Sequence, residues 1–571
     1  MTTSTTIDPI TLEVMASAMR SVVDETFIAL MKSAYSTNIK ERHDHSTAIC
    51  DRDGRLIVQA EMSLPIHIAS MTGLMTSVLS KVKLEEIEEG DIFVANDPHV
   101  AGGTHLPDIN FAAPVFVDGE ILCFVCNIAH HADIGGMVPG SMAGGMSEIY
   151  QEGLRIPVVR LFRRGELQRD LFDILLLNAR IPEERRGDYY AQIASAQLGV
   201  RRVKEIAGRY SAATIRRAFD DLVTRTRARM RLAISEIPDG TYTFEDVMDD
   251  DGLGTENIPI RLKVEVTGDR AVFDWRGSAP QVRGNINVPV NATQAAVAYS
   301  LKALLDPDIP NNQGVIDCCE LLTEPGTIVD CRAPAPVAAR ANTSQRLIDI
   351  IIGALAPALP HAAVGASNGA NTTAVFSGTD PRNGKPYLYL ETLGGGFGGR
   401  NDRDGKDGVQ VHITNTSNLP IEAIETEYPL RVVGYEIIED SGGAGTFRGG
   451  AGLRRIVQPV GHRCTFNGAG ERFTNAPWGV FGGGRGRPGR FVLRSDGEET
   501  RLPVKPSGIE IGPDDQVVVE TPGSGGYGDP HGREAEAVAD DLASGKYSAD
   551  FARKHYPQAS TGATDPAAAA E

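Results

Sequence analysis

Two mostly apolar segments separated by Asp118-Gly119 constrain the fold of this chain more than any other feature. The first covers residues 109–117 and the second residues 120–129. Asp-Gly between such segments is typical of a two-residue β-hairpin loop, because both residues tolerate the positive φ of a type I′ turn. The sequence therefore predicts a long β-hairpin over residues 109–129.

The register of this hairpin follows from its loop. With a two-residue loop, counting outward along the ladder places Asp108 opposite Ala129 and Pro107 opposite His130. Residues 104–108 and 130–133 are therefore expected to meet at the open end of the hairpin.

Ligand-type side chains gather at this open end. His105 and Asp108 precede or begin the first strand, and His130 ends the second. Two imidazoles and one carboxylate leave coordination positions open for water or substrate, as a catalytic metal site requires. A metal there would lower the pKa of a bound water and polarise a carbonyl or phosphoryl oxygen. From spacing alone, a polar hairpin end with surface histidines is an equally good interpretation.

Other residues near this end are candidates for supporting roles. Asp44 precedes a second predicted hairpin and is a candidate fourth metal ligand, whereas its neighbours His43 and His45 are expected to be solvated. His131 and Asp133 suit proton transfer. His131 is alternatively expected to point to the opposite side of the strand from His130, since successive strand side chains alternate.

A flexible loop of Gly, Met, Ser and Pro covers residues 135–145 and is a candidate lid beside the site. Its first residues, Gly135 and Gly136, are candidates for substrate contact. His99 is a further candidate for substrate contact, and the nearby Asp97 is alternatively only a turn former.

Size and charge limit the class of protein. A chain of 571 residues is too long for one core, so several domains are expected. Its net charge of -19 argues against nucleic acid as a partner. No apolar stretch reaches the roughly 18 residues that span a bilayer. The first residues lack a basic region followed by an apolar one, so no secretory signal is expected.

The seven cysteines are an odd number spread over the chain, which suits a reducing cytoplasm and predicts a cytoplasmic protein. The CxxC spacing of Cys123 and Cys126 lies inside the second strand of the hairpin. We therefore interpret these residues as buried strand cysteines and not as a redox pair. The adjacent pair Cys318-Cys319 is also expected to be structural.

The pattern along the chain predicts an α+β, multi-domain fold with mixed sheets, a helical N-terminal region and glycine-rich loops. Helices are expected over residues 9–31 (with Asp8 as N-cap), 62–83, most of 170–234, 293–305 and 344–359. Short alternating strands dominate after residue 238. The predicted domains are 1–237, containing the metal site; 238–343, rich in strands; 344–558, glycine-rich; and a disordered tail, 559–571.

Nucleotide-binding motifs are missing from the sequence. Glycine loops can cradle phosphate through their N–H groups, but neither a GxxxxGK[ST] motif nor a strand–GxGxxG–helix unit occurs. If ATP is used, we expect another chain to bind it.

The motifs of this chain resemble the hydantoinase B/oxoprolinase family over nearly the whole length. The resemblance is carried by Glu41-Arg42-x-Asp44-x-Ser46, Asn96-Asp97-Pro98, Gly102 to Asp108, His130-His131-Ala132-Asp133-x-Gly135-Gly136, Glu425-x-x-Tyr428-Pro429-Leu430, Asp440 to Gly445, Arg448-Gly449-Gly450 and Thr521 to Gly528.

The resemblance implies a metal site. In the related carboxylases, a His-x-x-Asp pair and a later His hold a divalent metal, and these positions correspond to His105, Asp108 and His130. Zinc is the first expectation for this ligand set, and manganese and iron(II) also suit it. The family usually has an aromatic residue where this chain has His99, His43 and His45, so these three are not expected to be shared ligands.

The resemblance also implies a partner and an activity. The partner would be a hydantoinase A-type ATPase subunit, in a hetero-oligomer that we expect to be a dimer of heterodimers. The first hypothesis is an ATP-dependent hydrolase of a small cyclic amide (a hydantoin, lactam or oxoproline), in which the partner phosphorylates the amide oxygen. The second is a subunit of an acetone or acetophenone carboxylase, and the third is a non-catalytic scaffold for the ATPase.

Overall fold

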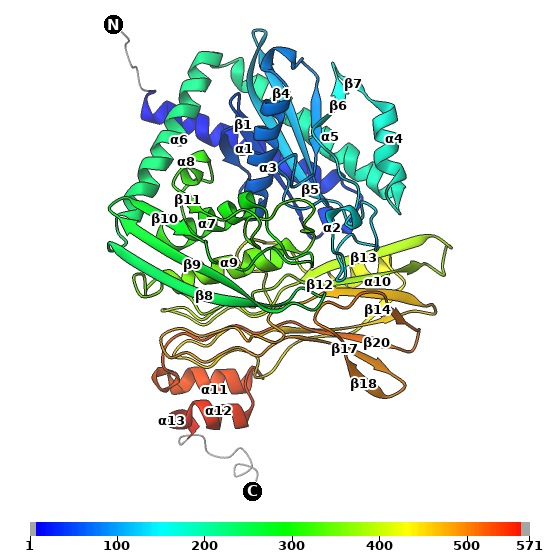
Figure 1. The fold of residues 1–571 in the computed structure, drawn as a ribbon, viewed down its shortest axis with the longest axis vertical. Coiled ribbons are helices and arrows are strands. Elements are labelled where there is room, and N and C mark those ends of the chain that lie inside the picture. The colour runs from blue at the N-terminus through cyan, green and yellow to red at the C-terminus, as the bar shows by residue number, and fades with distance from the viewer. Residues whose placement is uncertain (1–6, 561–571) are drawn as a thin grey trace.

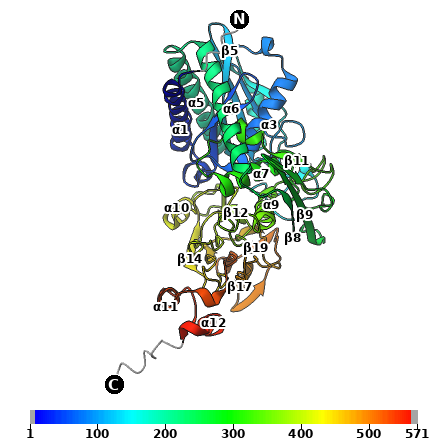
Figure 2. The same cartoon turned by 90° about the vertical axis from the view of Figure 1, so that its left-hand side faces the viewer.

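The computed structural model describes residues 7–560, which form an elongated molecule built from four β-sheets and the helices around them. The N-terminal region lies at one end and the last helices at the other (Figures 1 and 2). The predicted α+β fold with mixed sheets and a helical N-terminal region is confirmed. Of the predicted disordered tail, residues 561–571 lie outside the described residues, while 559 and 560 end the short helix α13 (Pro557–Ser560).

A seven-stranded antiparallel sheet organises the N-terminal region. Its strand order is β2-β1-β5-β4-β3-β6-β7. The strands are β1 (His45–Asp51), β2 (Leu56–Gln59), β3 (Ile92–Ala95), β4 (Asp108–Val117), β5 (Glu120–His130), β6 (Val159–Arg163) and β7 (Glu166–Leu167). The predicted hairpin is the pair β4 and β5 at the centre of this sheet, so both of its faces must be covered.

Helices cover the two faces of the sheet. Figure 2 shows α1 (Pro9–Ser33) and α5 (Pro182–Ala207) on one side and α3 (Pro65–Lys81) on the other. Helix α6 (Ala212–Ile234) shares a core with α1. Alternate strand residues serve the two sides: Val125 packs in the core with α1, whereas Phe124 and Cys126 pack in the core with α3. The Asp8 carboxylate accepts a hydrogen bond from the Thr11 N–H at 2.9 Å, as predicted for an N-cap. The short helices α2 (Thr37–Lys40) and α4 (Arg169–Leu177) complete the region.

The predicted hairpin register is wrong by one residue at its open end. The turn itself is as expected, with positive φ at Asp118 and Gly119. A β-bulge then leaves Leu122 of β5 without a partner on β4, and the ladder shifts. Asp108 consequently lies opposite His130 and not opposite Ala129. Residues directly opposite one another share a face, so the bulge places Asp108 and His130 on the same side of the sheet.

The middle region contains a four-stranded mixed sheet of order β11-β10-β9-β8. It consists of β8 (Gly240–Asp250), β9 (Glu256–Thr267), β10 (Arg270–Asp274) and β11 (Glu320–Leu322), with the helices α7 (Val290–Leu305), α8 (Gln313–Ile316) and α9 (Arg340–Leu355). All residues of α9 are buried, and its apolar ones share a core with this sheet. The domain boundaries stay predictions, but the one at 343/344 lies inside α9, which begins four residues earlier than expected.

The C-terminal region contains two antiparallel sheets, β13-β12-β16-β19 and β14-β15-β20-β17-β18. Their strands are β12 (Thr372–Thr379), β13 (Pro386–Leu393), β14 (Leu430–Ile437), β15 (Leu453–Pro459), β16 (Cys464–Ala469), β17 (Arg490–Ser495), β18 (Glu498–Arg501), β19 (Ile509–Ile511) and β20 (Gln516–Glu520). Helix α10 (Ile421–Glu427) packs beside them, and α11 (Ala535–Ala543) and α12 (Ala549–His555) lie at the far end with α13 (Figure 1).

The glycine-rich segments of this region pack against one another. Residues 365–369, 394–399, 442–452, 482–486 and 523–528 exchange backbone hydrogen bonds, such as Gly399 N–H to Gly525 O at 2.9 Å and Gly526 N–H to Gly484 O at 3.0 Å. A Cβ atom on Gly398 would lie 1.8 Å from the carbonyl oxygen of Gly365. We call these five segments the glycine layer. Their glycines therefore serve close backbone packing, because no side chain fits between the segments.

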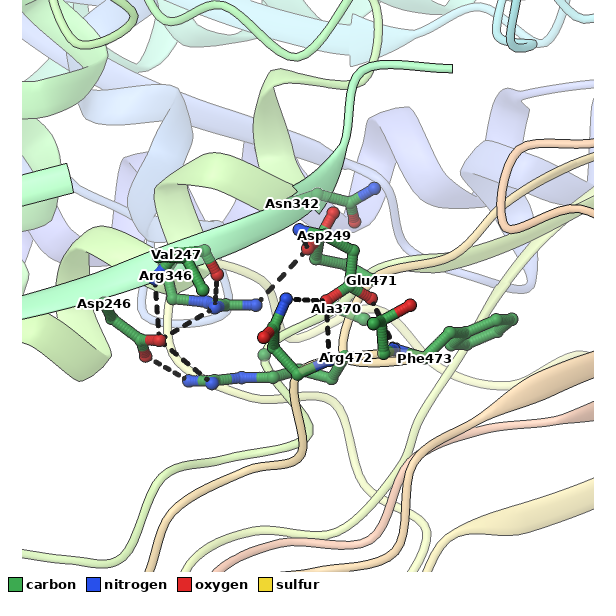
Figure 3. Close-up of polar contacts among 12 residues, drawn as sticks. Asp246, Val247, Asp249, Asn342, Arg346, Ala370, Glu471, Arg472 and Phe473 are labelled. Carbon is green, nitrogen blue, oxygen red and sulfur yellow. Dashed lines mark hydrogen bonds and ion pairs between the residues drawn. The ribbon is translucent and has the colours of Figure 1, made fainter. Parts of the chain in front are cut away.

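A buried network of charges joins the middle region to the C-terminal region (Figure 3). Arg346 on α9 and Arg472 both contact the Asp246 carboxylate of β8, at 3.2 and 2.8 Å. Arg346 also contacts Glu471, which in turn lies 3.3 Å from Lys505. Buried charges must be paired, so these contacts determine how the two regions sit against each other.

Replacing Gly398 with alanine is expected to lower the free energy of unfolding by about 3 kcal/mol or more, since the new methyl group would overlap the Gly365 carbonyl. Gly240→Ala is the matched control. Its added Cβ would meet nothing nearer than Tyr242 at 3.6 Å, so a change within about 0.5 kcal/mol is expected. Urea unfolding followed by circular dichroism measures both variants. Equal midpoints for the two would contradict the close packing of the glycine layer.

Candidate metal centre

His105, Asp108 and His130 come together in the structure. One ligand atom from each side chain lies within 4.8 Å of the other two, and all three residues are buried. His105 Nε2 lies 2.9 Å and His130 Nδ1 lies 3.2 Å from Asp108 Oδ1. Tetrahedral ligands with bonds of about 2.1 Å lie about 3.4 Å apart, so a small adjustment of these side chains accommodates a metal ion.

The central sheet determines which side chains reach this point. Asp108 begins β4, His130 ends β5, and the two are paired directly across the ladder. They lie on the face that α3 covers, and α3 adds a further imidazole there: His67 Nε2 is 3.7 Å from Asp108 Oδ2. His105 arrives from the segment before β4, where Pro107 opposes a regular helix.

The hydrogen bonding of His105 fits a metal ligand. Its Nδ1–H donates to the carbonyl oxygen of Ala338 at 3.0 Å, which leaves the lone pair on Nε2. Burial and the positive charge of Arg340 lower the pKa of His105 to about 4, so the ring is neutral at neutral pH. A neutral ring has one N–H, yet both nitrogens of His105 face oxygen atoms. Neither His105 Nε2 nor Asp108 Oδ1 has a hydrogen-bond partner. A cation between these two atoms resolves the conflict.

Asp108 is held in place by Arg340, the first residue of α9. The guanidinium Nη2 lies 2.7 Å from Asp108 Oδ2 and 3.0 Å from the Thr104 hydroxyl. Asp108 Oδ2 is thereby occupied, while Oδ1 is directed at the two imidazoles. Although burial alone would raise the pKa of Asp108, His105 and Arg340 hold it well below its ordinary value. The carboxylate is therefore ionised, as a metal ligand must be.

Asp44, the candidate fourth ligand, lies at the edge of this cluster. Its carboxylate oxygens are 3.9 Å from His130 Nδ1 and 3.9 Å from His67 Nε2. The structure thus brings Asp44 to the site without direct contact to His105. Its neighbour His45 was expected to be solvated. That prediction is wrong, since the His45 ring is buried and stacked on Phe27 with centroids 3.9 Å apart.

Two residues of the cluster, His67 and Arg340, were not found from the sequence. His67 is the one imidazole in the apolar start of α3, and its Nδ1 bonds the Ser46 hydroxyl at 2.8 Å. A lone histidine in an apolar helix was the available signal. The sequence held no such signal for Arg340. The residue before it, Ala339, is the N-cap of α9 but has no side chain that could mark the start of a helix.

The cluster borders a cavity of about 30 Å³, which also contacts Met142 from the predicted lid loop. Such a volume holds a metal ion or a water molecule but no cyclic amide. A substrate must therefore be presented from a neighbouring space or reach the cavity after the wall has moved.

His131 and Asp133, the predicted proton-transfer residues, do not border this cavity. His131 points to the opposite face of the sheet, where Nε2 contacts Gln192 Oε1 at 2.9 Å and the ring packs on Tyr189. Asp133 forms an ion pair with Arg180 at 2.7 Å. Alternation along the strand explains why neighbouring histidines reach different faces.

The predicted substrate-contact residues are also separate from the cluster. His99 is half-buried, its Nε2 contacts the Ala335 carbonyl at 2.9 Å, and it borders another cavity of about 960 Å³. Gly135 and Gly136 both have positive φ and pack closely on the backbone of Asn178 and of residues 151–152. Their structural role is a tight turn that other residues cannot adopt.

A second buried carboxyl group supports the backbone behind His105. Oε1 of Glu152 accepts hydrogen bonds of 2.7 Å from the N–H groups of Val337 and Ala338. Ala338 is the residue whose carbonyl oxygen orients His105. Burial raises the pKa of Glu152 to about 8.

None of the helices within residues 7–560 is long and apolar enough to cross a bilayer.

All seven cysteines are free and buried. Cys123 and Cys126 belong to cores on opposite faces of the sheet, so the prediction of buried strand cysteines is confirmed.

His130→Gln is expected to lower the amount of metal bound per chain by about tenfold or more, because it removes one of the predicted ligands. The chains are first loaded with zinc or manganese and then dialysed. His131→Gln is the matched control and should keep the wild-type metal content, since this neighbour faces α5. Elemental analysis of the purified chains gives the readout. Similar losses in both variants would contradict the assignment.

Glu152 is expected to make stability depend on pH. Its folded-state pKa of about 8 exceeds the ordinary 4.5, so the folded chain keeps a proton that the unfolded chain has lost. Stability then falls as pH rises from 4.5 to 8, by up to a few kcal/mol at about 1.4 kcal/mol for each unit of pKa difference. Glu152→Gln should remove this component in urea unfolding at several pH values. An unchanged slope would contradict the raised pKa.

Comparisons with known proteins show the family to which this chain belongs. The family model described as Hydantoinase B/oxoprolinase matches residues 8–530. One chain of a putative D-/L-hydantoinase from Pseudomonas sp. (strain NS671) is 33% identical over 555 residues, covering 94% of this chain and 93% of that protein.

Two solved structures share the fold. The ATP-dependent caprolactamase from Pseudomonas jessenii has a TM-score of 0.91 at 31% identity, with 96% of each chain covered. A nucleotide-free acetone carboxylase has a TM-score of 0.90 at 19% identity, covering 96% of this chain and 79% of that one, which is a likeness of fold alone. The match of the family model over most of the chain, together with these relatives, shows that this protein belongs to the Hydantoinase B/oxoprolinase family.

Proposed function

We propose that this chain is the hydrolytic subunit of an ATP-dependent enzyme that opens small cyclic amides. The observation that carries the proposal is the buried set of His105, Asp108 and His130, in which the facing atoms His105 Nε2 and Asp108 Oδ1 have no hydrogen-bond partner. The similarity to a caprolactamase and to one chain of a hydantoinase supports the cyclic amide as substrate class.

The activating step is assigned to a partner, an ATPase subunit of the hydantoinase A type. The sequence has no nucleotide-binding motif, and the hydantoinase relative is named as one of the subunits of an enzyme. Transfer of the γ-phosphoryl group to the amide oxygen gives ADP and makes the amide carbon far more electrophilic. One water then breaks the C–N bond and the ring nitrogen leaves as an amine. A second water releases the phosphate and the carboxylate.

The residues of this chain would serve the hydrolytic steps. His105, Asp108 and His130 would hold a divalent metal, with Asp44 as the candidate fourth ligand, and such an ion supplies Lewis acidity at an oxygen atom. Arg340 keeps the Asp108 carboxylate oriented and brings a positive charge to the cavity. His67 borders the cavity, and burial lowers its pKa, so its neutral ring can accept a proton. By position, His67 is a better candidate for moving protons than His131 or Asp133.

The acetone carboxylase fold supports a second candidate function. In a ketone carboxylase, a phosphorylated enolate would attack activated bicarbonate at the same ligand set. The low identity of that likeness makes it the weaker candidate.

The two functions are separated by assaying the complex of this chain and its ATPase partner with ATP. A cyclic amide hydrolase should open lactams or hydantoins without added bicarbonate, and His105→Ala should lower kcat by at least about a hundredfold. Turnover of a ketone that requires bicarbonate would replace the hydrolase with the carboxylase. Full activity of His105→Ala would instead indicate that this chain is a scaffold.

The purified chain alone is expected to hydrolyse no ATP, because the proposal places nucleotide binding in the partner. Release of phosphate from ATP, measured with and without the partner, checks this. ATPase activity that copurifies with this chain and is lost in His105→Ala would contradict the assignment of ATP hydrolysis to the partner.

A further inference from the structure

Two side-chain donors have no partner at the cavity beside the candidate metal centre, which we call the metal cavity. They are Nη1 of Arg340 and Nδ2 of Asn371, and both residues border this cavity. Within residues 7–560, neither atom makes a hydrogen bond, yet neither is fully enclosed. The two residues are only 4% and 9% exposed. Polar groups this deep in a protein are normally satisfied, so two free donors at one cavity indicate a missing acceptor.

The other nitrogens of Arg340 are already engaged. Nε lies 3.2 Å and Nη2 lies 3.0 Å from the Thr104 hydroxyl oxygen, and Nη2 also lies 2.7 Å from Asp108 Oδ2. Because a guanidinium is rigid and planar, these contacts also determine where Nη1 lies. Arg340 therefore orients a predicted metal ligand with one part of its side chain and keeps Nη1 free for a ligand in the cavity.

The amide of Asn371 is oriented by the buried side chain of Gln345. Oε1 of Gln345 accepts the backbone N–H of Ile413 at 3.3 Å, and Nε2 donates to the Val411 carbonyl at 2.9 Å. These backbone groups determine which end of the Gln345 amide is the nitrogen. The same Nε2 contacts Asn371 at 3.2 Å, so the Asn371 atom on that side must be the acceptor, Oδ1. The other atom, Nδ2, is then a donor.

The charges around the cavity indicate which kind of acceptor fits. The carboxylates of Asp108 and Asp44 lie near Arg340. Glu152 is also near, but burial raises its pKa to about 8, so it is neutral at pH 7. Two negative charges and one positive charge would become net positive with a divalent cation on the predicted ligands. A net positive cavity with two free N–H donors suits an oxyanion.

The space around the cavity suits a ligand that enters with one end. The metal cavity of about 30 Å³ has room for the oxygen atoms at the end of a ligand. Thr414 borders this cavity and also a larger one of about 430 Å³, next to α3 and α7. The larger cavity leaves space for the body of a ligand on the other side of Thr414.

We infer that Arg340 and Asn371 are catalytic residues that form an oxyanion pocket for the phosphoryl group of the activated amide. Arg340 Nη1–H and Asn371 Nδ2–H donate hydrogen bonds to phosphoryl oxygens in the metal cavity. This inference rests on the proposed function and adds to it the residues that hold the phosphoryl group.

The step that these donors assist is the release of phosphate. After the ring has opened, the former amide carbon is that of an acyl phosphate. Water attacks this carbon, the C–O bond to the phosphoryl group breaks, and the electron pair of that bond leaves with phosphate. The products are a carboxylate, phosphate and a proton. Donors that are held in place before the reaction stabilise the charge that gathers on the leaving phosphate.

The test is binding of inorganic phosphate to the full-length chain by isothermal titration calorimetry, after loading with manganese and dialysis, without ATP or partner. Phosphate has the oxygens of the phosphoryl group and is smaller than a cyclic amide. Asn371→Asp keeps an acceptor for Gln345 but replaces the free donor with an oxygen, so it should weaken phosphate binding at least about tenfold. The control Asn401→Asp adds the same charge at an exposed residue and should leave phosphate binding unchanged.

Arg340→Lys tests the other donor. A lysine ammonium can still pair with Asp108 but has no second nitrogen that reaches into the cavity. Phosphate binding should weaken about fivefold or more, while the manganese content of the chain, from elemental analysis, stays at the wild-type value. Circular dichroism verifies that each variant is folded.

Equal phosphate affinity of wild type and Asn371→Asp, or no phosphate binding by the manganese-loaded wild type, would overturn the inference. Loss of manganese from Arg340→Lys would show that Arg340 only holds Asp108 and would remove it from the pocket. Phosphate binding that depends on Asn371, without turnover of any cyclic amide by the complex, would instead reject the proposed function. The two failures are therefore distinguishable.

Discussion

The alternation of side chains across the central sheet is the constraint on which the rest of the site depends. Along each strand, side chains alternate between the face covered by α3 and the face covered by α1 and α5. The bulge at Leu122 places Asp108 directly opposite His130, so the two side chains lie on the same face. Without the extra residue, the carboxylate and the imidazole would lie on opposite sides of a sheet whose two faces are both buried.

Because the residues of the candidate site are buried, their charges must be paired. Asp108 is fully enclosed, so its charge is tolerated only with Arg340 and the imidazoles around it. Arg340 comes from α9, a helix of the middle region, and the Ala338 carbonyl that orients His105 lies just before it. The candidate metal centre is therefore built from regions far apart in sequence.

The same helix links the site to the C-terminal region. Arg346 of α9 contacts Glu471 (Figure 3), and Asp349 of the same helix contacts Arg472. These contacts replace hydration that the charges have lost, and they leave few alternative arrangements of the regions. The glycine layer supports this rigidity, because its backbones pack too closely for side chains to intervene.

The sequence by itself determined the hairpin and its Asp118-Gly119 turn, because turn preference and strand alternation are local properties of the chain. It also indicated that His105, Asp108 and His130 lie near the open end of the hairpin, but the bulge decided that Asp108 and His130 share a face. The sequence also indicated the family through motifs in a fixed order. The one-residue error in register arose because a bulge has no distinct local signal in an apolar strand. His67, Arg340 and the pair of Asn371 with Gln345 were decided by tertiary structure alone. Each reaches its partner across 21 to 232 residues of sequence, and only the packing of helices on the sheet and the pairing of buried polar groups bring them together.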